Sequence, residues 1–352
     1  MYREEKMKIK KIVFGIMGLC MMGCAVTMGS NTSYAKNKTE IIKNNVLKEY
    51  RGNAETYNVP NNVKAISSRA FEKAKRLKKV VISKNVKKIS YDAFSGAKNL
   101  TKITVNKKNR HFDSYKGVLY NEGFKEMIIV PEGIKTLVPA SNSTISDGCH
   151  ECLNLPKLTS LTIGAKWKTL GEETVWWNPG GLTQIKVQKN NKVFYVKDGN
   201  LFRKNNEGKV EYVLYIAKGS DEVAEYTIPS ETEKINVYAF ANANIKKLVI
   251  PESVTEIDIA AFNGCKVENL VIHSKNAKAS MTGTDFATIW PSNNYTHCPN
   301  LKTITIMQDD TIMPHDGATN VFSKDVVIYS RVNSTAKLYA EKNGYQWCEL
   351  KL

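Results

Sequence analysis

A short frame of apolar residues recurs along the chain and limits what the chain can fold into. In one clear copy, Ile245, Leu248 and Ile250 stand at steps of three and two, which is typical of a short strand with one buried face. A Pro-led turn, two further apolar residues and an Ala-Phe pair complete the unit. Self-similarity of this kind predicts a stacked repeat protein, because each unit buries its apolar face against its neighbours.

The frame returns at nearly constant intervals, and so does the second half of the unit. The clearest intervals between successive copies are 22, 23 and 24 residues. Because Ala permits close approach of the next turn and Phe fills the interior, stacked turns are predicted to form a column of Phe rings. The strand frames begin at Leu77, Leu100, Leu158, Leu182, Ile245, Val267 and Leu301, and the Ala-Phe pairs lie at 70–71, 93–94, 239–240 and 261–262.

The frame Ile-Pro-x-x-Val-x-x-Ile with Ala-Phe resembles the bacterial BspA-like leucine-rich repeat surface proteins over about residues 57–352. Segments near 111–131 and 193–218 resemble the hairpins that interrupt some repeats of that family. Residues 326–352 resemble its closing strand-helix-strand, with a helix end at Asn343-Gly344. The resemblance implies an α/β repeat solenoid: leucine-rich repeats of about 22–24 residues with short strands, helical or irregular turns and β-hairpin insertions.

The N-terminal 35 residues are predicted to be an export signal. A lysine-rich start precedes an apolar run of 17 residues, Ile12 to Met28, and the small residues Ser33 and Ala35 then occupy the positions that a signal peptidase reads. Two alternatives stay open: a retained N-terminal anchor helix, and a lipid anchor at Cys24, for which Met21 stands where such sites carry Leu. The mature chain is expected to have no membrane span.

The remaining sequence is divided by its composition and its repeats. The polar segment after the export signal is interpreted as a flexible lead-in or an N-terminal cap. The predicted organisation is a signal peptide over 1–35, the lead-in or cap over 36–56, the repeat solenoid over 57–325 and the capping strand-helix-strand over 326–352.

Charge is distributed unevenly along a chain whose formal net charge is +17. Residues 73–112 contain thirteen Lys or Arg and one acid, Asp92, whereas residues 221–268 contain nine acids and four Lys. One interpretation is an ordinary solvated surface. The other is a basic region that attracts wall teichoic acid, an acidic glycan or an anionic protein. Nucleic acid is excluded as a partner, because the export signal places the protein outside the cell.

Side chains between the buried residues of each strand are expected to point outward and to stack in columns from turn to turn. Lys79, Lys102 and Lys247 are predicted to share one column, and Lys186 to lie in the next. These four lysines are candidate ligand contacts on a docking surface. The alternative is that the columns only support the sheet through cross-strand pairs.

Aromatic residues outside the frame supply the other candidate contacts. Trp176 and Trp177 cannot both occupy the single Phe position of their turn, so one of them is predicted to be exposed, and exposed Trp is enriched in binding hot spots. Trp290 and Tyr295, in a long insert, are the second pair of candidates. Trp167, by contrast, is predicted to be a core residue.

The sequence offers little for catalysis or for metal binding. Cys149-x-x-Cys152 has no second Cys pair at partner spacing, and Cys152 is predicted to pack as a small buried residue three positions before Leu155. The odd, sparse set of cysteines is not a disulfide framework. The five His residues show no metal-ligand spacing, and no catalytic motif is found. No cofactor and no metal are expected, and the chain is predicted not to be an enzyme.

The function expected from the resemblance is that of an exported cell-surface or secreted protein that binds a protein ligand, such as an adhesin for host or neighbouring cells. The alternative is a structural component of the cell envelope, held by its charge to anionic wall polymer. A weaker alternative is a carbohydrate-active or redox enzyme built on the inserts.

Overall fold

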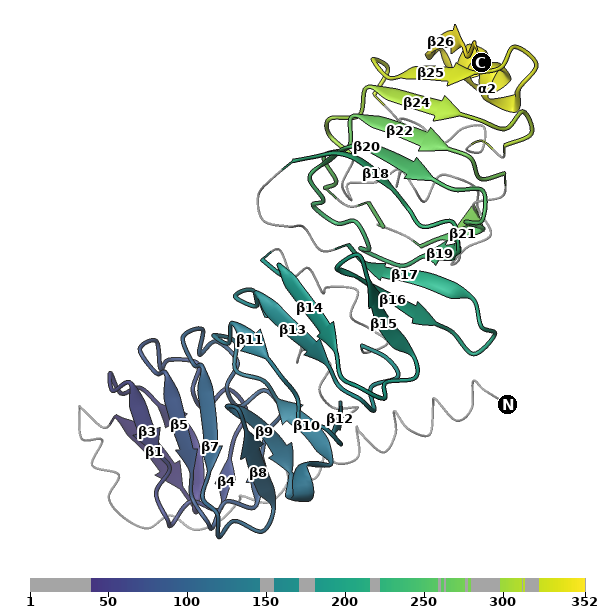
Figure 1. The fold of residues 1–352 in the computed structure, drawn as a ribbon. Helices are drawn as coiled ribbons and strands as arrows, with labels where there is room; N and C mark the ends of the chain where they lie inside the picture. Colours follow the sequence, from purple (N-terminus) through teal and green to yellow (C-terminus); the bar gives the residue numbers. More distant parts are fainter. Residues whose placement is uncertain are drawn as a thin grey trace, which may run out of the picture. The chain divides into compact units, whose positions relative to one another are not determined.

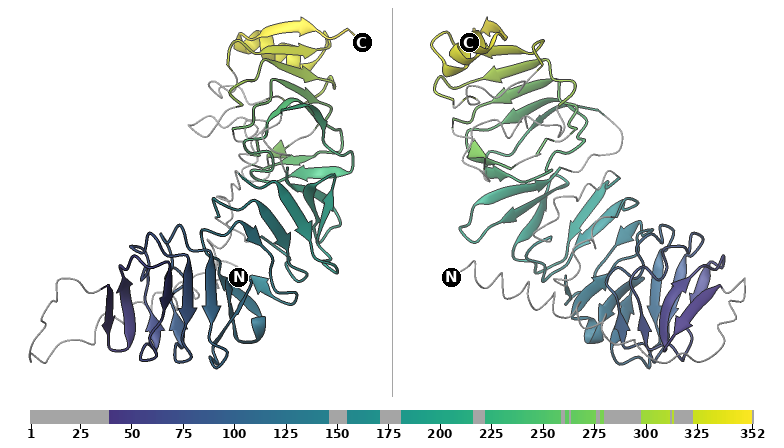
Figure 2. Two further views of the ribbon diagram at one scale, coloured as in Figure 1. Left: turned by 60° about the vertical axis from the view of Figure 1, so that its left-hand side comes forward. Right: turned by 180° about the vertical axis from the view of Figure 1, so that it is seen from behind.

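The computed structural model divides into two units, Met1–Lys38 and Thr39–Leu352, and the description below concerns the second. Within that unit it describes residues 39–145, 155–170, 181–215, 222–258, 261–262, 264–275, 278–279, 298–311, 313 and 323–351. These residues form a solenoid in which successive turns of short strands lie side by side (Figures 1 and 2).

Each of the apolar frames in the sequence forms the longer strand of a turn, as predicted, and these strands pair in parallel with those of neighbouring turns. Ile103 is fully buried while Lys102 beside it is exposed, as the alternation of a half-buried strand requires. The parallel sheets contain, in order, β3 (Thr56–Asn58), β5 (Lys79–Ile82) and β7 (Lys102–Val105); β11 (Thr136–Leu137), β13 (Ser160–Ile163) and β14 (Gln184–Val187); and β18 (Val223–Thr227), β20 (Ile245–Ile250), β22 (Asn269–Ile272), β24 (Thr303–Ile306), β25 (Val327–Ser330) and β26 (Gln346–Glu349).

In several turns the second half forms another strand, mostly of two residues, which also pairs in parallel with its neighbours. Ile66 is buried on such a strand and pairs with Ile89 of the next turn. The second strands thus form a separate side of the solenoid. They are β4 (Ala65–Ile66), β6 (Lys88–Ile89), β19 (Thr232–Ile235), β21 (Glu256–Ile257) and β23 (Lys278–Ala279).

The helical part of the predicted α/β class is not confirmed. In the part of the chain that the structure describes, helix is confined to α2 (Thr335–Asn343) and the short 3-10 helix η1 (Glu122–Phe124). Arg69 and Tyr238, directly before Ala-Phe, have φ values of 49° and 56°, and residues in this left-handed region interrupt an α-helix. The Phe71 amide donates to the Ala93 carbonyl of the next turn, at 3.1 Å, instead of bonding within its own turn.

Two hairpins interrupt the regular turns. Each has a tight turn of two residues with positive φ, Lys116-Gly117 in the first and Asp198-Gly199 in the second, the geometry that suits the twist of an antiparallel hairpin. A third strand follows each hairpin and returns the chain to the solenoid by pairing in parallel with a later short strand. The strands are β8 (Phe112–Tyr115), β9 (Val118–Asn121), β10 (Glu126–Ile129) and β12 (Thr144–Ile145), and β15 (Phe194–Lys197), β16 (Asn200–Lys204) and β17 (Val210–Leu214).

One Asn side chain fixes the start of each hairpin in the same way. Asn109 Nδ2 donates to the carbonyls of Ser83 and Val86 in the preceding turn, both at 2.9 Å, while its Oδ1 accepts from the Phe112 amide. Asn191 makes the equivalent contacts with Gly164, Trp167 and Phe194 at the second hairpin. A single amide therefore ties the hairpin to the turn before it.

The interior contains the predicted column of aromatic rings. The rings of Phe71 and Phe94 stack with centroids 4.8 Å apart and planes 4° apart. In the later turns Phe240 stacks on Phe262 at 5.6 Å and also contacts Tyr212 at 4.7 Å. Aromatic stacking adds to area burial, so each ring stabilises its own turn and the next.

Both ends of the described solenoid are covered. At the first end, β1 (Glu40–Lys43) and β2 (Val46–Tyr50) form a hairpin whose second strand pairs with β4. At the other end, α2 ends at Asn343, and Gly344, which has a φ of 69°, is its C-cap. In the described residues, no helix is long and apolar enough to cross a membrane.

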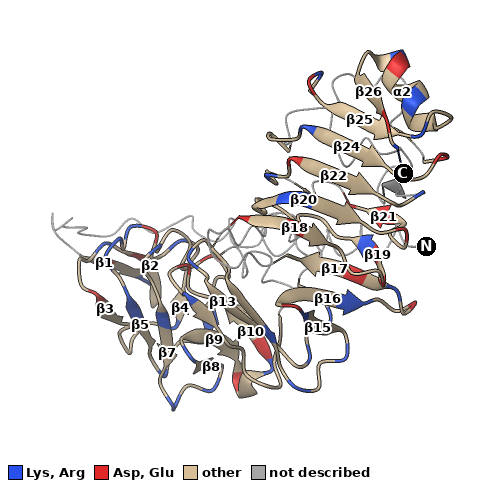
Figure 3. Cartoon of the chain, turned by 45° about the horizontal axis from the view of Figure 1, so that its top comes forward, with Lys and Arg blue, Asp and Glu red and all other residues tan. Residues whose placement is uncertain are grey.

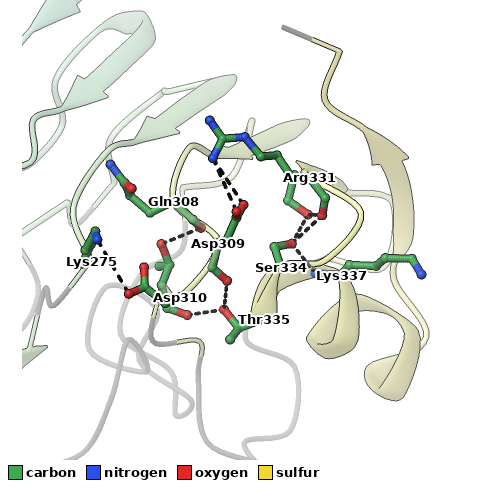
Figure 4. Close-up of polar contacts among 10 residues, drawn as sticks. Lys275, Gln308, Asp309, Asp310, Arg331, Ser334, Thr335 and Lys337 are labelled. Carbon is green, nitrogen blue, oxygen red and sulfur yellow. Dashed lines mark hydrogen bonds and ion pairs between the residues drawn. The ribbon is translucent and has the colours of Figure 1, made fainter.

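Polar contacts attach α2 to the preceding turns (Figure 4). Ser334 Oγ accepts from the Lys337 amide at 3.2 Å and caps the helix. The Thr335 amide donates to the Asp309 carbonyl at 2.8 Å, and Arg331 Nη1 lies 3.5 Å from both carboxylate oxygens of Asp309. These contacts therefore hold the C-terminal cap against the preceding turn.

Candidate functional site

The outward side chains of the longer strands form the predicted columns. Lys79 pairs in register with Lys102, and Lys247 with Asn269. Lys186 lies in the neighbouring column, opposite Thr162. The columns run across adjacent parallel strands, which are spaced by about 4.8 Å.

The structure distinguishes the four candidate lysines by their surroundings. Lys247 Nζ lies 3.2 Å from the Glu225 carboxylate, so its charge is compensated within the sheet. Lys102 and Lys186 are exposed and Lys79 is half-buried, and no described carboxylate forms an ion pair with these three. Lys79 and Lys102 therefore remain as adjacent, uncompensated cations.

The four aromatic candidates lie outside the described residues: Trp176, Trp177, Trp290 and Tyr295. Cys149 and Cys152 also lie outside them. Trp167 is 2% exposed, which confirms its prediction as a core residue. The prediction that Cys152 packs as a small buried residue concerns a residue outside the described part of the chain and stays a prediction. Leu155 itself occupies the small-residue slot, because the Leu158 amide donates to its carbonyl just as Leu77 donates to Ala74.

A second group of cations lies on the loops that follow the longer strands of the N-terminal turns and at the start of the short strand β6. We call it the basic edge. Backbone bonds align its members from turn to turn, since the Lys87 amide donates to the Lys64 carbonyl at 2.8 Å. All its members are exposed: Lys64, Lys84, Lys87, Lys88, Lys107, Lys108 and Arg110.

Acidic residues do not compensate this charge. Among the described residues, only two of the thirteen cations between 73 and 112 take part in ion pairs, Lys73 with Glu49 at 2.8 Å and Lys78 with Glu55 at 2.7 Å. Asp92, the single acid in this stretch, accepts a hydrogen bond from Ser68 at 2.6 Å and forms no ion pair among the described residues. We call Lys79, Lys102 and the basic edge together the basic surface.

The later turns show the opposite arrangement, in which lysines and acids alternate and pair (Figure 3). Neighbouring turns place opposite charges next to each other, as for Lys302 and Glu268 at 2.8 Å. Paired charges generate little net potential, so these later turns contribute less positive field than the N-terminal turns, where most cations have no described acidic partner. The pairs include Lys197 with Glu231, Lys234 with Glu256 and Asp258, Lys246 with Glu222, and Lys247 with Glu225.

The acids beside the basic surface are held in their ionised form. Hydrogen bonds from Arg51 and Lys73 lower the pKa of Glu49 to about 2. A hydrogen bond from Lys78 also lowers the pKa of Glu55. These two carboxylates neutralise their own partners and leave Lys79 and Lys102 unpaired.

A buried acid in the second hairpin has a structural role that the sequence did not indicate. Glu211 is 3% exposed, and its Oε2 accepts from Arg203 Nε at 2.5 Å and from Asn236 Nδ2 at 3.2 Å. Arg203 and Glu211 face each other in register across β16 and β17. One contact thus comes from β16 and the other from the residue that follows β19, and both strands pair with β17, which fixes the register of this sheet.

The residue after Glu211 on β17, Tyr212, belongs to a group of hydrogen-bonded polar side chains. Tyr212 and Tyr226 share a hydrogen bond at 2.8 Å, and Asn200 donates to Tyr226 at 3.1 Å. Burial raises the pKa of Tyr212 well above its usual range, so its hydroxyl stays protonated. In the described residues, no group of three or more His, Cys, Asp or Glu side chains is arranged to hold a metal ion.

Comparison with known proteins identifies the kind of solenoid. A model of the BspA-type leucine-rich repeat region matches residues 39–180 and 215–332 in six copies, and the chain belongs to this family. A leucine-rich cell surface protein from Faecalibacterium prausnitzii has a TM-score of 0.51 at 16% identity, over 94% of this chain and 96% of that chain. That likeness shows a shared fold.

Two further solved structures are similar at lower scores. A leucine-rich repeat protein from Eubacterium ventriosum has a TM-score of 0.44 at 17% identity, over 80% of this chain and 77% of that chain. The pneumococcal vaccine antigen PcpA has a TM-score of 0.39 at 17% identity, over 85% of this chain and 80% of that chain. No curated protein sequence matches the chain significantly.

Proposed function

We propose that the chain is an exported, cell-surface or secreted protein that binds an acidic protein ligand through its basic surface and serves in adhesion to host or neighbouring cells. The observation that carries this proposal is the contrast in ion pairing between the N-terminal turns and the later turns. The N-terminal export signal and the surface protein of the same fold support the location. The protein acts without catalysis.

The basic surface suits a ligand that carries several acidic groups. A single exposed ion pair contributes only about 0–1 kcal/mol, so binding requires contacts with several turns at once. Lys79 and Lys102 on adjacent strands, and Lys84 and Lys107 on adjacent loops, supply such a repeated arrangement. Binding is expected to weaken as salt rises, since exposed charges are screened over about 8–10 Å at physiological ionic strength.

Reversing two charges on the strand face is expected to weaken binding of an acidic polypeptide. The double variant Lys79→Glu/Lys102→Glu changes the net charge by four units and places acids where the ligand needs cations. We expect the Kd for poly-L-glutamate to rise about tenfold or more, as measured by fluorescence titration at low and at physiological salt.

The matched control is Lys192→Glu/Lys204→Glu, which makes the same change of net charge at exposed positions of the second hairpin. Its Kd should stay within about twofold of the parent value. Equal weakening by both variants would show that net charge alone governs binding, and would contradict a localised site.

An anionic wall polymer is the second candidate ligand, in a structural role within the cell envelope. The observation that favours it is the basic edge, whose cations continue from turn to turn in a line that a flexible polyanion can follow. Purified wall teichoic acid, compared with poly-L-glutamate at equal charge, separates the two ligands. Tighter teichoic acid binding that is lost in Lys84→Glu/Lys107→Glu and kept in Lys79→Glu/Lys102→Glu would favour the structural role.

A further inference from the structure

Cys265 occupies a position of the turn that alanine occupies elsewhere. In each case the backbone amide donates to the carbonyl of the Phe that lies three residues earlier. Cys265 bonds to Phe262 in this way at 2.9 Å, and Ala74 bonds to Phe71 at the same distance. The side chain at this position points into the core, and Cys265 is fully buried.

Cys298 lies in the same column one turn later. The Leu301 amide donates to its carbonyl, as the Leu77 amide donates to Ala74. Cys298 Sγ lies 3.8 Å from the Phe262 carbonyl oxygen, the same oxygen that accepts from the Cys265 amide. The neighbouring Cys298 thiol lowers the pKa of Cys265, and the neighbouring Cys265 thiol together with burial raises the pKa of Cys298.

The column spacing fits a covalent link. Turns joined by parallel strands are about 4.8 Å apart, and a disulfide requires Cα atoms about 4.4–6.8 Å apart with side chains that face each other. Both thiols belong to one buried apolar cluster. We propose that Cys265 and Cys298 form a disulfide when the chain folds in an oxidising environment.

The reaction is an exchange with a disulfide-bearing oxidant, such as oxidised glutathione or an extracellular thiol-disulfide oxidoreductase. One thiolate attacks the oxidant and releases one reduced thiol; the second thiolate attacks the mixed disulfide and releases the other. Two protein thiols and one oxidant disulfide thus give one protein disulfide and two reduced thiols. Because both sulfurs are buried in the folded turn, the exchange accompanies folding, and the product is shielded from reductants.

The bond would fasten the last turns of the solenoid to the preceding ones. Cys265 leads into β22 and Cys298 leads into β24, and these positions are 298 − 265 = 33 residues apart in the chain. In a solenoid each turn contacts only its neighbours, so end turns open more easily than central ones. Closing this long loop removes conformational freedom from the unfolded chain.

The test uses the mature chain, refolded with oxidised glutathione and digested without reduction. We expect mass spectrometry to find the Cys265 peptide joined to the Cys298 peptide, 2 Da lighter than the two free thiols together. Alkylation of both cysteines after refolding would overturn the proposal. So would pairing of either of them with Cys348, which is exposed on β26.

A stability measurement provides the second arm. Reductant should lower the Tm of the oxidised parent by about 5 °C and should leave Cys265→Ala/Cys298→Ala unchanged. That variant should fold, because alanine occupies the same position in three other turns, at Ala74, Ala97 and Ala243. Cys348→Ala is the control and should respond to reductant like the parent. A parent Tm that is insensitive to reductant would also overturn the proposal.

Discussion

Replacing Phe240 by alanine is expected to lower the free energy of unfolding by about 3–5 kcal/mol, the range for removing a fully buried Phe. Phe240 is 0% exposed, and its ring contacts those of Tyr212 at 4.7 Å and Phe262 at 5.6 Å. The variant would leave a cavity between two turns that depend on each other for their packing. Urea unfolding followed by far-UV circular dichroism measures the loss.

Two further variants test whether the loss of stability comes from the buried ring. Phe240→Leu keeps most of the apolar volume and should cost clearly less than alanine. Tyr91→Ala removes an aromatic side chain that is 69% exposed, and its effect should stay within about 0.5 kcal/mol. A cost below about 1 kcal/mol for Phe240→Ala would contradict a core built on the ring column.

Replacing Arg203 by alanine is expected to cost about 3 kcal/mol, because it leaves the Glu211 carboxylate buried without its counter-charge. Glu211 is 3% exposed, and after the change its Oε2 would keep, among the described residues, only the 3.2 Å hydrogen bond from Asn236. The cost arises from the unpaired charge, so the double variant Arg203→Ala/Glu211→Gln should recover most of the stability. The same urea unfolding measures both.

An exposed ion pair in the turn between β16 and β17 provides the control. Lys209 lies 3.3 Å from Glu207, with the two side chains 40% and 70% exposed. Lys209→Ala should change stability by less than about 1 kcal/mol, since solvent screens such pairs. If Arg203→Ala and Lys209→Ala cost the same, the buried Glu211 does not depend on its arginine.

Much of the fold could be predicted from sequence because its core follows a simple period. The step of three and two at Ile245, Leu248 and Ile250 indicates a strand and its buried face, and Ala-Phe indicates where rings stack. The helical part of the α/β class, which the family resemblance implied, is not confirmed, because the turns before Ala-Phe do not keep the backbone of an α-helix. Left-handed residues such as Arg69 and bonds to the next turn decide against it.

The candidate site could be predicted less well from the sequence, because it depends on which charged side chains form ion pairs between neighbouring turns. The sequence indicated that residues 73–112 are basic, but Lys79 and Lys247 looked alike until Glu225 was placed beside Lys247. The Asn contacts left a signal that was missed: Asn109 and Asn191 each stand three residues before a Phe that opens a hairpin. Comparing the two hairpin segments with each other would have found it.

The central claim, that this is an exported protein that binds acidic partners through its basic surface, is tested most directly by locating the mature chain in fractionated producing cells and determining its N-terminus by mass spectrometry. The account predicts a chain that begins at Lys36, outside the cells and released from them by high salt. A lipid-modified Cys24 in the membrane fraction would show that a lipid anchor, and not charge, holds the protein at the cell surface. A chain with residues 1–35 intact in the cytoplasm would contradict export, and with it the proposed adhesion.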